Sequence, residues 1–93
     1  MPRHTHADGQ GGAFSLERDG REVATLRYTA PEAGRTTFYT TQVDPSWGGQ
    51  GLGTEVLELA LDWADSQGLK VVPQCSFVAR YFDKHPERAR LRA

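Results

Sequence analysis

Short runs of alternating apolar and polar residues follow residue 12. AFSLER at residues 13–18 is followed by Asp19-Gly20 and then by REVATLRY at residues 21–28. Asp-Gly between two such runs predicts a β-hairpin, because both central residues of a type I′ turn need a positive φ. A second turn, APEAG, leads into RTTFYTTQV at residues 35–43, which is rich in β-branched and aromatic residues. The pattern predicts an antiparallel meander of three strands.

The periodicity changes after a cluster of glycines at residues 48–53. Apolar residues then recur every three or four positions, and carboxylates fall together on another face; the apolar residues are Leu52, Val56, Leu59, Ala60, Trp63 and Ala64, and the acidic ones are Glu55, Glu58, Asp62 and Asp65. This pattern predicts an amphipathic helix that Gly68 closes, with Trp63 in the core. We interpret the acidic stripe as a solvated face, with a docking face for a basic partner as the alternative.

Two further elements are expected after this helix. LKVVPQC at residues 69–75 is typical of a buried strand whose end Pro73 places at the sheet margin or at a bulge. Ser76 is the expected cap of a short helix, SFVARYFDKH, which ends before Pro86 and precedes a basic tail. A right-handed crossover would set the last strand parallel to residues 35–43, which predicts an α+β fold with a mixed sheet. The glycine loop would then lie at the carboxyl end of a strand, where ligands bind.

The first residues, MPRHTHADGQGG, contain no apolar cluster. Residues 1–12 are therefore expected to be a disordered leader before a single domain at residues 13–93. His4 and His6 lack further ligands at useful spacing, so no metal site is predicted.

Charge and cysteine content narrow the classes of function. The chain has 11 basic and 12 acidic side chains, so it lacks the basic field that favours binding to nucleic acid or to an anionic membrane. A single cysteine, Cys75, excludes an internal disulfide. No signal peptide and no membrane-spanning run is visible, so a cytoplasmic location is expected.

The glycine cluster before a helix is typical of a phosphate site. Amides of the first helical turn lack intrahelical acceptors, the helix dipole favours negative charge there, and glycines let a phosphate approach. A Walker A loop is disfavoured, because Thr54 stands where its lysine must be and Glu55 where its Ser or Thr must be. A dinucleotide fingerprint is disfavoured too, because Thr54 takes the place of its third glycine and the loop follows a meander.

The segment from residue 43 to residue 53 resembles the pyrophosphate loop of the GNAT superfamily of N-acetyltransferases, and the chain from residue 42 to residue 87 resembles a small family within it. In that superfamily a strand ending V-x-P is followed by Q/R-x-x-G-x-G/A and a helix; here Val43, Pro45 and GGQGLG at residues 48–53 take those places. The block GLKVVPQCSFVARYFDKHPE resembles, more narrowly, a small single-domain family of GNAT-like proteins of about this length. The resemblance covers residues 13 to about 88 and implies a GNAT-like fold that binds acetyl-CoA.

The resemblance also implies roles for particular residues. The implied cofactor-binding residues, with the pyrophosphate on the loop, are Val43, Gly48, Gly49, Gln50, Gly51, Leu52, Gly53, Thr54, Ser76, Tyr81 and His85. Cys75 is the candidate catalytic residue, because in the family the thioester reaches the end of the strand that carries this thiol here. The thiol would act as a general base or a transient acyl acceptor, with a buried structural cysteine as the alternative. Packing and capping are the alternative roles of Tyr81 and His85.

The chain also departs from the family pattern. Gly48 stands where Gln or Arg is usual, Thr40 stands where histidine is common, and Asp83 lies where larger GNAT enzymes have a general-acid tyrosine. The resemblance implies an N-acetyltransferase that moves acetyl from acetyl-CoA to an amine that the sequence does not identify, possibilities being a protein lysine or N-terminus. A non-catalytic acyl-CoA-binding or protein-interaction module is the alternative.

Overall fold

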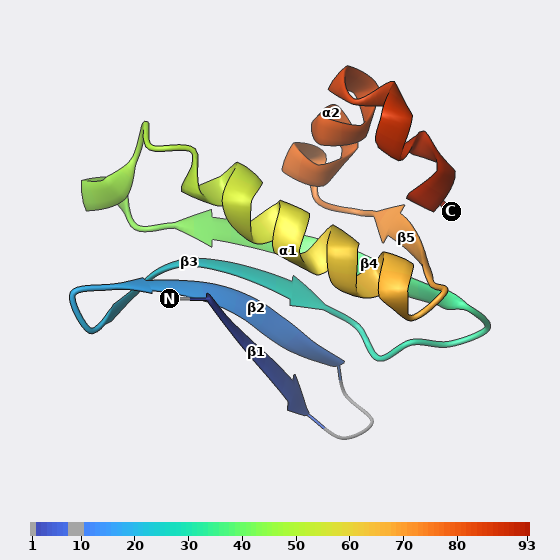
Figure 1. Cartoon of the computed structure of the whole chain (residues 1–93), viewed down its shortest axis with the longest axis horizontal. Coiled ribbons are helices and arrows are strands. Elements are labelled where there is room, and N and C mark those ends of the chain that lie inside the picture. The colour runs from blue at the N-terminus through green and yellow to red at the C-terminus, as the bar shows by residue number, and fades with distance from the viewer. Residues whose placement is uncertain (1, 8–10) are drawn as a thin grey trace.

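The computed structural model of the chain describes residues 2–7 and 11–93, with side chains from residue 11 onward. In this part of the chain one sheet has the strand order β1-β2-β3-β4-β5, and α1 and α2 lie side by side on one side of it (Figure 1). The elements in chain order are β1 (Pro2–Ala7), β2 (Gly11–Arg18), β3 (Arg21–Tyr28), β4 (Arg35–Val43), the 3₁₀ turn η1 (Pro45–Trp47), α1 (Leu52–Ser66), β5 (Lys70–Pro73), α2 (Ser76–Lys84) and the 3₁₀ turn η2 (Pro86–Leu91).

The predicted meander and crossover are confirmed. β2, β3 and β4 pair antiparallel in sequence order, and α1 connects β4 to the parallel strand β5. The hairpin between β2 and β3 turns at Asp19 and Gly20, whose φ angles are 53° and 75°, as a type I′ turn requires. The α+β fold with a mixed sheet is therefore the observed one.

The expectation of a disordered leader is wrong for the part of it that the structure describes. Pro2–Ala7 forms β1, which pairs antiparallel with β2 from Pro2↔Leu16 to Ala7↔Gly11. Strand pairing uses backbone N–H and C=O groups, so a segment without an apolar cluster can still extend a sheet. Residues 1 and 8–10 of the expected leader lie outside the described residues.

The core lies between α1 and the sheet. The buried residues of α1 are Leu52, Val56, Leu57, Ala60, Leu61 and Ala64. Leu57 and Leu61 were missing from the predicted apolar face, whereas Leu59 and Trp63 are only half-buried beside the core. Trp63 stacks against Tyr28 of β3 with ring centroids 4.5 Å apart, so it belongs to the packed interior as predicted. Each fully buried leucine of this face contributes about 1.5–3 kcal/mol to the stability of the fold.

The two parallel strands separate after a short paired stretch. β4 and β5 pair from Arg35↔Lys70 to Phe38↔Pro73, and then β5 ends. The Cys75 amide still donates to the Phe38 carbonyl at 3.1 Å, but residues 40–43 of β4 pair only with β3. Pro73 has no N–H to continue the ladder, which agrees with its predicted place at the end of the strand. One edge of β4 is therefore open next to the glycine loop.

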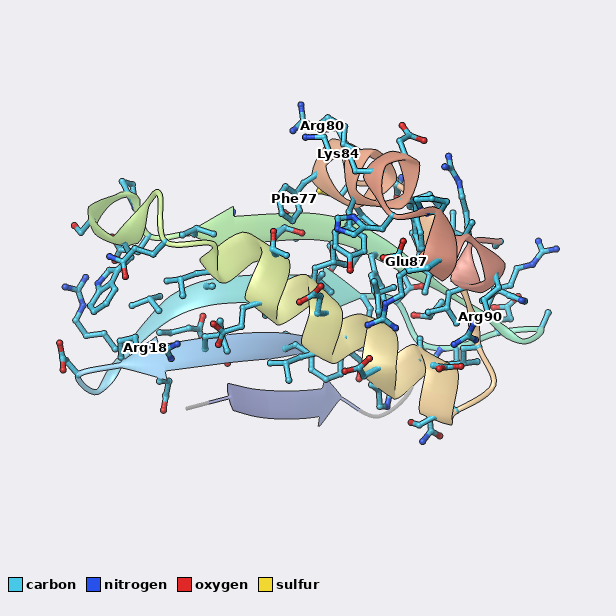
Figure 2. The ribbon with its side chains drawn as sticks, turned by 45° about the horizontal axis from the view of Figure 1, so that its top comes forward. Arg18, Phe77, Arg80, Lys84, Glu87 and Arg90 are labelled. Atoms are coloured by element: carbon cyan, nitrogen blue, oxygen red, sulfur yellow. The ribbon has the colours of Figure 1, made fainter. Side chains whose placement is uncertain are left out.

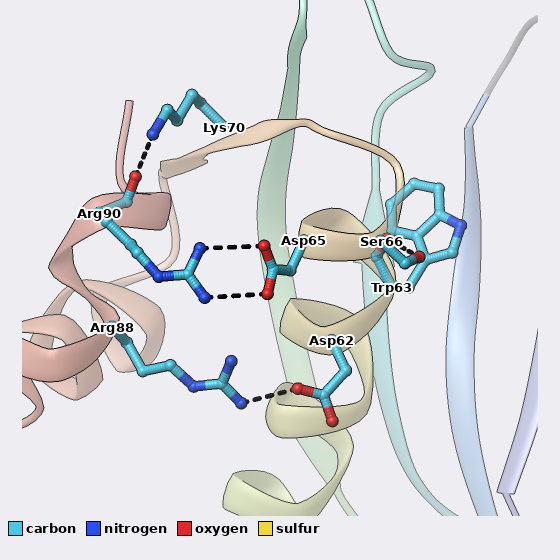
Figure 3. Close-up of polar contacts among 7 residues, drawn as sticks. All are labelled: Asp62, Trp63, Asp65, Ser66, Lys70, Arg88 and Arg90. Atoms are coloured by element: carbon cyan, nitrogen blue, oxygen red, sulfur yellow. Dashed lines mark hydrogen bonds and ion pairs between the residues drawn. The ribbon is translucent and has the colours of Figure 1, made fainter.

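The acidic stripe of α1 is not simply a solvated face. Arg88 and Arg90 of η2 bind Asp62 at 2.8 Å and Asp65 at 2.9 Å, and Lys70 also donates to the Arg90 carbonyl (Figure 3). The other two carboxylates of the stripe accept from Arg18 and Tyr81. All four carboxylates are exposed, so the interpretation as a solvated face is confirmed, and the chain's own basic tail also folds back along α1. No helix in the described residues is long and apolar enough to cross a membrane.

Candidate functional site

The glycine loop turns the chain from β4 into α1. Asp44 begins η1 and its side chain accepts from the Ser46 amide at 2.8 Å. Gly49 and Gly51 have φ angles of 78° and 73°, in the left-handed region that glycine adopts readily. Gly51 is the N-cap residue of α1, and without a side chain it provides no cap of its own. The loop therefore ends in a helix whose first amides remain uncapped.

These amides form a continuous row. Within the described part of the chain, the N–H groups of residues 49–54 donate to no acceptor, whereas Glu55, the next residue, donates to the Gly51 carbonyl at 3.0 Å. Gly49, Gln50 and Gly51 are exposed, so the row faces solvent at its beginning. Free amides at the positive end of a helix dipole are suited to an anion such as a pyrophosphate.

Other residues predicted for the cofactor lie differently. The Gly48 amide donates to the Pro45 carbonyl at 3.3 Å and is not part of the free row. The Leu52 side chain is 4% exposed and belongs to the core, so only its amide faces the site. Ser76 is exposed and is the first residue of α2 rather than its cap, because the N-cap residue is Cys75. The expected capping role of Ser76 is therefore wrong.

The loop and α2 meet at Gly53. A Cβ at this position would lie 3.1 Å from Phe77 Cζ and 3.5 Å from Val43 Cγ2. The absence of a side chain thus lets the Phe77 ring pack directly on the first turn of α1. Val43, which was predicted as a cofactor-binding residue, is half-buried at this contact.

Cys75 lies where β5 passes into α2, at the open end of the paired strands. Its Sγ lies 3.8 Å from Thr41 Oγ1 of β4. Burial raises the pKa of the thiol, but hydrogen bonds from the Val78 and Phe77 amides and from Thr41 outweigh it, and the pKa lies below its ordinary value of 9.0. The amides come from the first turn of α2, which stabilises a thiolate as it would any anion. Cys75 is a free, half-buried thiol.

A hollow of about 310 Å³ separates the beginning of α1 from α2. It brings together three of the predicted residues, Thr54, Tyr81 and His85, with three that were not assigned to the cofactor, Phe77, Arg80 and Lys84. The Tyr81 and His85 rings are stacked with centroids 4.0 Å apart. The Tyr81 hydroxyl donates to Glu58 Oε2 of α1 at 2.8 Å. The spacing of residues 77, 80, 81, 84 and 85 on one helix face could have indicated the missed side chains.

A metal site has no support in the described side chains, where no group of three or more His, Cys, Asp or Glu residues is arranged to hold an ion. The side chains of His4 and His6 lie outside this description.

Solved structures with the same fold are N-acetyltransferases and related proteins. A GCN5-like protein from Staphylococcus aureus has a TM-score of 0.72 and 20% identity, with 98% of this chain and 87% of that chain covered. The ribosomal-protein-S18-alanine N-acetyltransferase from Escherichia coli has a TM-score of 0.67 and 22% identity, with 83% and 53% covered. Rv2747 from Mycobacterium tuberculosis, solved in complex with CoA, has a TM-score of 0.60 and 22% identity, with 74% and 46% covered. The chain spans about half the length of the last two proteins.

The family comparison covers most of the chain. No protein of curated function matches it. Residues 13–91 match the family described as GCN5-related N-acetyl-transferase, a range that includes the meander, the glycine loop, both helices and Cys75. The chain belongs to the GCN5-related N-acetyltransferase family.

Proposed function

We propose that the protein binds acetyl-CoA and transfers its acetyl group to an amine. The observation that carries this proposal is the row of free amides at residues 49–54, which lies beside the open edge of β4. A pyrophosphate fits the amides, and an extended chain with amide groups fits an unpaired strand edge. Acetyl-CoA combines both features in one molecule. A cytoplasmic location is part of the proposal, because the one cysteine is a free thiol.

The order of the groups along the site supports this placement. With the pyrophosphate on the loop and the pantetheine chain along residues 39–43, the thioester comes toward Cys75, where the two parallel strands separate. Val43 and the amides of Gly49 to Thr54 would hold the cofactor, and Tyr81 and His85 would line its far end. The Gly48 amide donates to the Pro45 carbonyl, so it is not available to the pyrophosphate.

The acetyl transfer needs a base and has one candidate at the thioester. In direct transfer, the amine nitrogen attacks the thioester carbonyl carbon, the carbon–sulfur bond breaks, CoA leaves as a thiolate, and the Cys75 thiolate takes the proton that the amine loses. In covalent transfer, the Cys75 thiolate attacks the carbonyl carbon, the bond from that carbon to the CoA sulfur breaks, and CoA leaves as a thiolate. The amine then attacks the acetyl-cysteine, the bond to Cys75 Sγ breaks, and the released Cys75 thiolate takes the proton that the amine loses. Both routes need the thiolate, so the lowered pKa of Cys75 supports either.

A second hollow offers an approach for the acceptor. It measures about 630 Å³ and runs along β3 and β4, and its lining includes Glu22, Asp44 and Thr41. Thr41 also contacts Cys75, so an amine in this hollow would lie close to the thiol. Asp44 forms an ion pair with Arg21 at 3.0 Å, so Glu22 is the carboxylate of this hollow that suits a cationic acceptor, such as a protein lysine or N-terminus.

The proposal is tested by calorimetric titration with CoA and acetyl-CoA, followed by an acetylation screen against small amines and basic peptides. We expect binding of both ligands and turnover of at least one cationic amine. Cys75→Ala should bind CoA within a few fold of the parent and lose on the order of 10²-fold in turnover. An acetyl adduct on Cys75 by mass spectrometry would identify the covalent route. Binding without turnover would contradict the transferase and favour a non-catalytic acyl-CoA-binding module.

A further inference from the structure

The basic side chains in the hollow between α1 and α2 have no role in the acetyl transfer. Arg80 and Lys84 line this hollow together with Thr54 of α1. Figure 2 shows both side chains projecting from the same part of α2, with Phe77 on the same helix. Residues 77, 80, 81, 84 and 85 follow the spacing of one helical face, so the hollow is built from one stripe of α2.

The charge of the hollow is uncompensated. No Asp or Glu is among the residues that line it, and Arg80 and Lys84 form no ion pair with any described residue. By contrast, the arginines of η2 and its end all pair with carboxylates; they are Arg88, Arg90 and Arg92. Two cations one helical turn apart repel each other unless an anion lies between them. The hollow is thus suited to a group with at least two negative charges.

The aromatic residues of the same stripe of α2 are held in place by a hydrogen bond to α1 and by stacking. The Tyr81 hydroxyl is fixed by Glu58 of α1, and the His85 ring stacks on the Tyr81 ring at an interplanar angle of 16°. His85 Nδ1 lies 2.9 Å from the Tyr81 carbonyl; since a carbonyl only accepts, Nδ1 carries the proton in this bond. A flat, fixed aromatic surface beside two cations suits a phosphorylated nucleoside.

Thr54 connects this hollow to the free amides. Its amide is the last in the row and its side chain lines the hollow, so the hollow begins where the pyrophosphate site ends. Besides the two phosphates of its pyrophosphate, CoA carries a third phosphate on the 3′ position of its ribose, with about two negative charges at neutral pH. We propose that Arg80 and Lys84 bind this 3′-phosphate, so that the protein discriminates CoA from dephospho-CoA; this inference rests on the proposed function.

The test compares CoA with dephospho-CoA, which differ only in the 3′-phosphate. The parent should bind CoA about ten- to a hundredfold more tightly, as expected for charge-assisted hydrogen bonds from an arginine and a lysine. In Arg80→Gln/Lys84→Gln both ligands should bind equally, with the affinity for dephospho-CoA unchanged. Arg27→Gln/Arg35→Gln is the matched control, because it removes the same charge from two exposed arginines without an ion pair in the described residues. The control should keep the full preference for CoA.

Three outcomes would overturn the assignment. Equal affinity of the parent for CoA and dephospho-CoA would show that contacts of the 3′-phosphate do not contribute to binding. If the double variant lost the same affinity for CoA and for dephospho-CoA, the two cations would act through a general electrostatic attraction to the pyrophosphate and not through the 3′-phosphate. If the parent bound neither ligand, the proposed function itself would fail and this assignment with it, a result distinct from binding both ligands equally. Circular dichroism of the variants checks that α2 is intact.

Discussion

Gly51 acts through its backbone alone. With a φ of 73° it starts α1 and orients the row of free amides, and a Cβ there would meet no atom within 4 Å. Any side chain at this position would therefore strain the backbone rather than clash with a neighbour. The left-handed conformation costs a residue other than glycine about 1–2 kcal/mol. A substituted loop would avoid this cost by changing its backbone conformation, which would turn the amides away from the bound phosphate.

We expect Gly51→Val to weaken CoA binding by on the order of a hundredfold, because two charge-assisted hydrogen bonds to the phosphates would be lost. Calorimetry measures this effect. Gly68→Val is the matched control, since Gly68 has a φ of 69° and open space around it but lies beyond the other end of α1. The control should lose stability and keep its affinity. Equal CoA affinity of folded Gly51→Val and parent would remove the loop from the phosphate site.

Gly48 is the place to add the side chain that the family usually has. Its φ of −64° and ψ of 155° are open to any residue, and a Cβ would lie 3.5 Å from the Pro45 carbonyl, an ordinary contact. Gly48→Arg should tighten CoA binding by adding a cation beside the pyrophosphate. Gly48→Met, of similar length without a charge, should leave the affinity unchanged. If both variants bound CoA as the parent does, position 48 would not face the phosphates.

The thiol of Cys75 should titrate below an ordinary cysteine. Its folded pKa is lowered from 9.0, so the shift stabilises the fold above the unfolded pKa and the gain is lost as pH falls through the folded pKa. The rate of iodoacetamide alkylation should have its midpoint at a lower pH in the native protein than in urea. Thr41→Val, which removes the hydroxyl 3.8 Å from Sγ, should move the midpoint upward. A native midpoint equal to that in urea would contradict this.

Residues with a local signature could be identified from the sequence, and residues defined by packing could not. The free amides follow from glycines before a helix, a relation within a few positions of the chain. Arg80 and Lys84 could not be identified in this way, because they belong to the site only through the hollow that they share with Thr54. The distance between α1 and α2 cannot be predicted from the sequence of either helix. Ser76 was taken for a cap because of its residue type, but β5 ends early enough that Cys75 occupies the cap position.

At the scale of elements, η2 is bound to α1 by ion pairs. Arg90 binds Asp65 through both guanidinium nitrogens at 2.9 Å, and Arg88 binds Asp62 one turn earlier. Beyond η2, the Ala93 amide donates to the Val71 carbonyl of β5 at 2.8 Å. The sequence showed an acidic stripe and a basic tail, but an ion pair across 25 residues depends on the turn that α2 and η2 make in space.

Loss of the ion pair between Arg90 and Asp65 should make the protein more sensitive to acid. The hydrogen bond from Arg90 lowers the pKa of Asp65 below 3.8 and outweighs the opposing effect of burial. The pair therefore stabilises the fold above that pH, and this stabilisation is lost as pH falls through the folded pKa. Acid unfolding of Arg90→Ala should therefore begin at a higher pH than that of the parent, and 1 M salt should reduce the difference. Arg35→Ala, which removes an exposed arginine without an ion pair in the described residues, is the control.

The acid limb is followed by circular dichroism for Arg90→Ala, Asp65→Ala and the double variant. The double variant should be no less stable than the worse single one, because each single variant leaves a charge without its partner. Strictly additive losses would show that the two side chains act independently.

At the scale of the molecule, the order of four strands and a helix could be predicted from the sequence. The prediction used the alternation of apolar and polar residues, the turn residues and the right-handed crossover rule. β1 was not predicted because Pro2–Ala7 has no alternating apolar pattern. It joins the sheet through backbone pairing with β2, which leaves no signal in the side chains. In the sequence, Pro73 is the residue that signals the separation of β4 from β5, because it has no N–H to continue the ladder.

Because the proposed ligand joins the loop, β4 and α2, its binding should stabilise the whole fold. CoA at a hundred times its dissociation constant adds about 2.7 kcal/mol, which raises the melting temperature of a domain of this size by on the order of 10 °C or more. Differential scanning calorimetry measures the shift. Pantetheine, which lacks the phosphates, should give a much smaller shift at the same concentration. Equal shifts from the two ligands would argue against the phosphate site.

The open edge of β4 has a consequence for the handling of the protein. Residues 39–43 present strand hydrogen-bonding groups that β5 does not cover, and the exposed Tyr39 lies at their start. An uncovered strand edge is a template on which another polypeptide can add a strand, which is the usual route to self-association of sheet proteins. We therefore expect the protein without bound CoA to self-associate more readily than the protein with CoA along this edge. Purification and storage with CoA should therefore reduce self-association, because the proposed ligand would cover this edge.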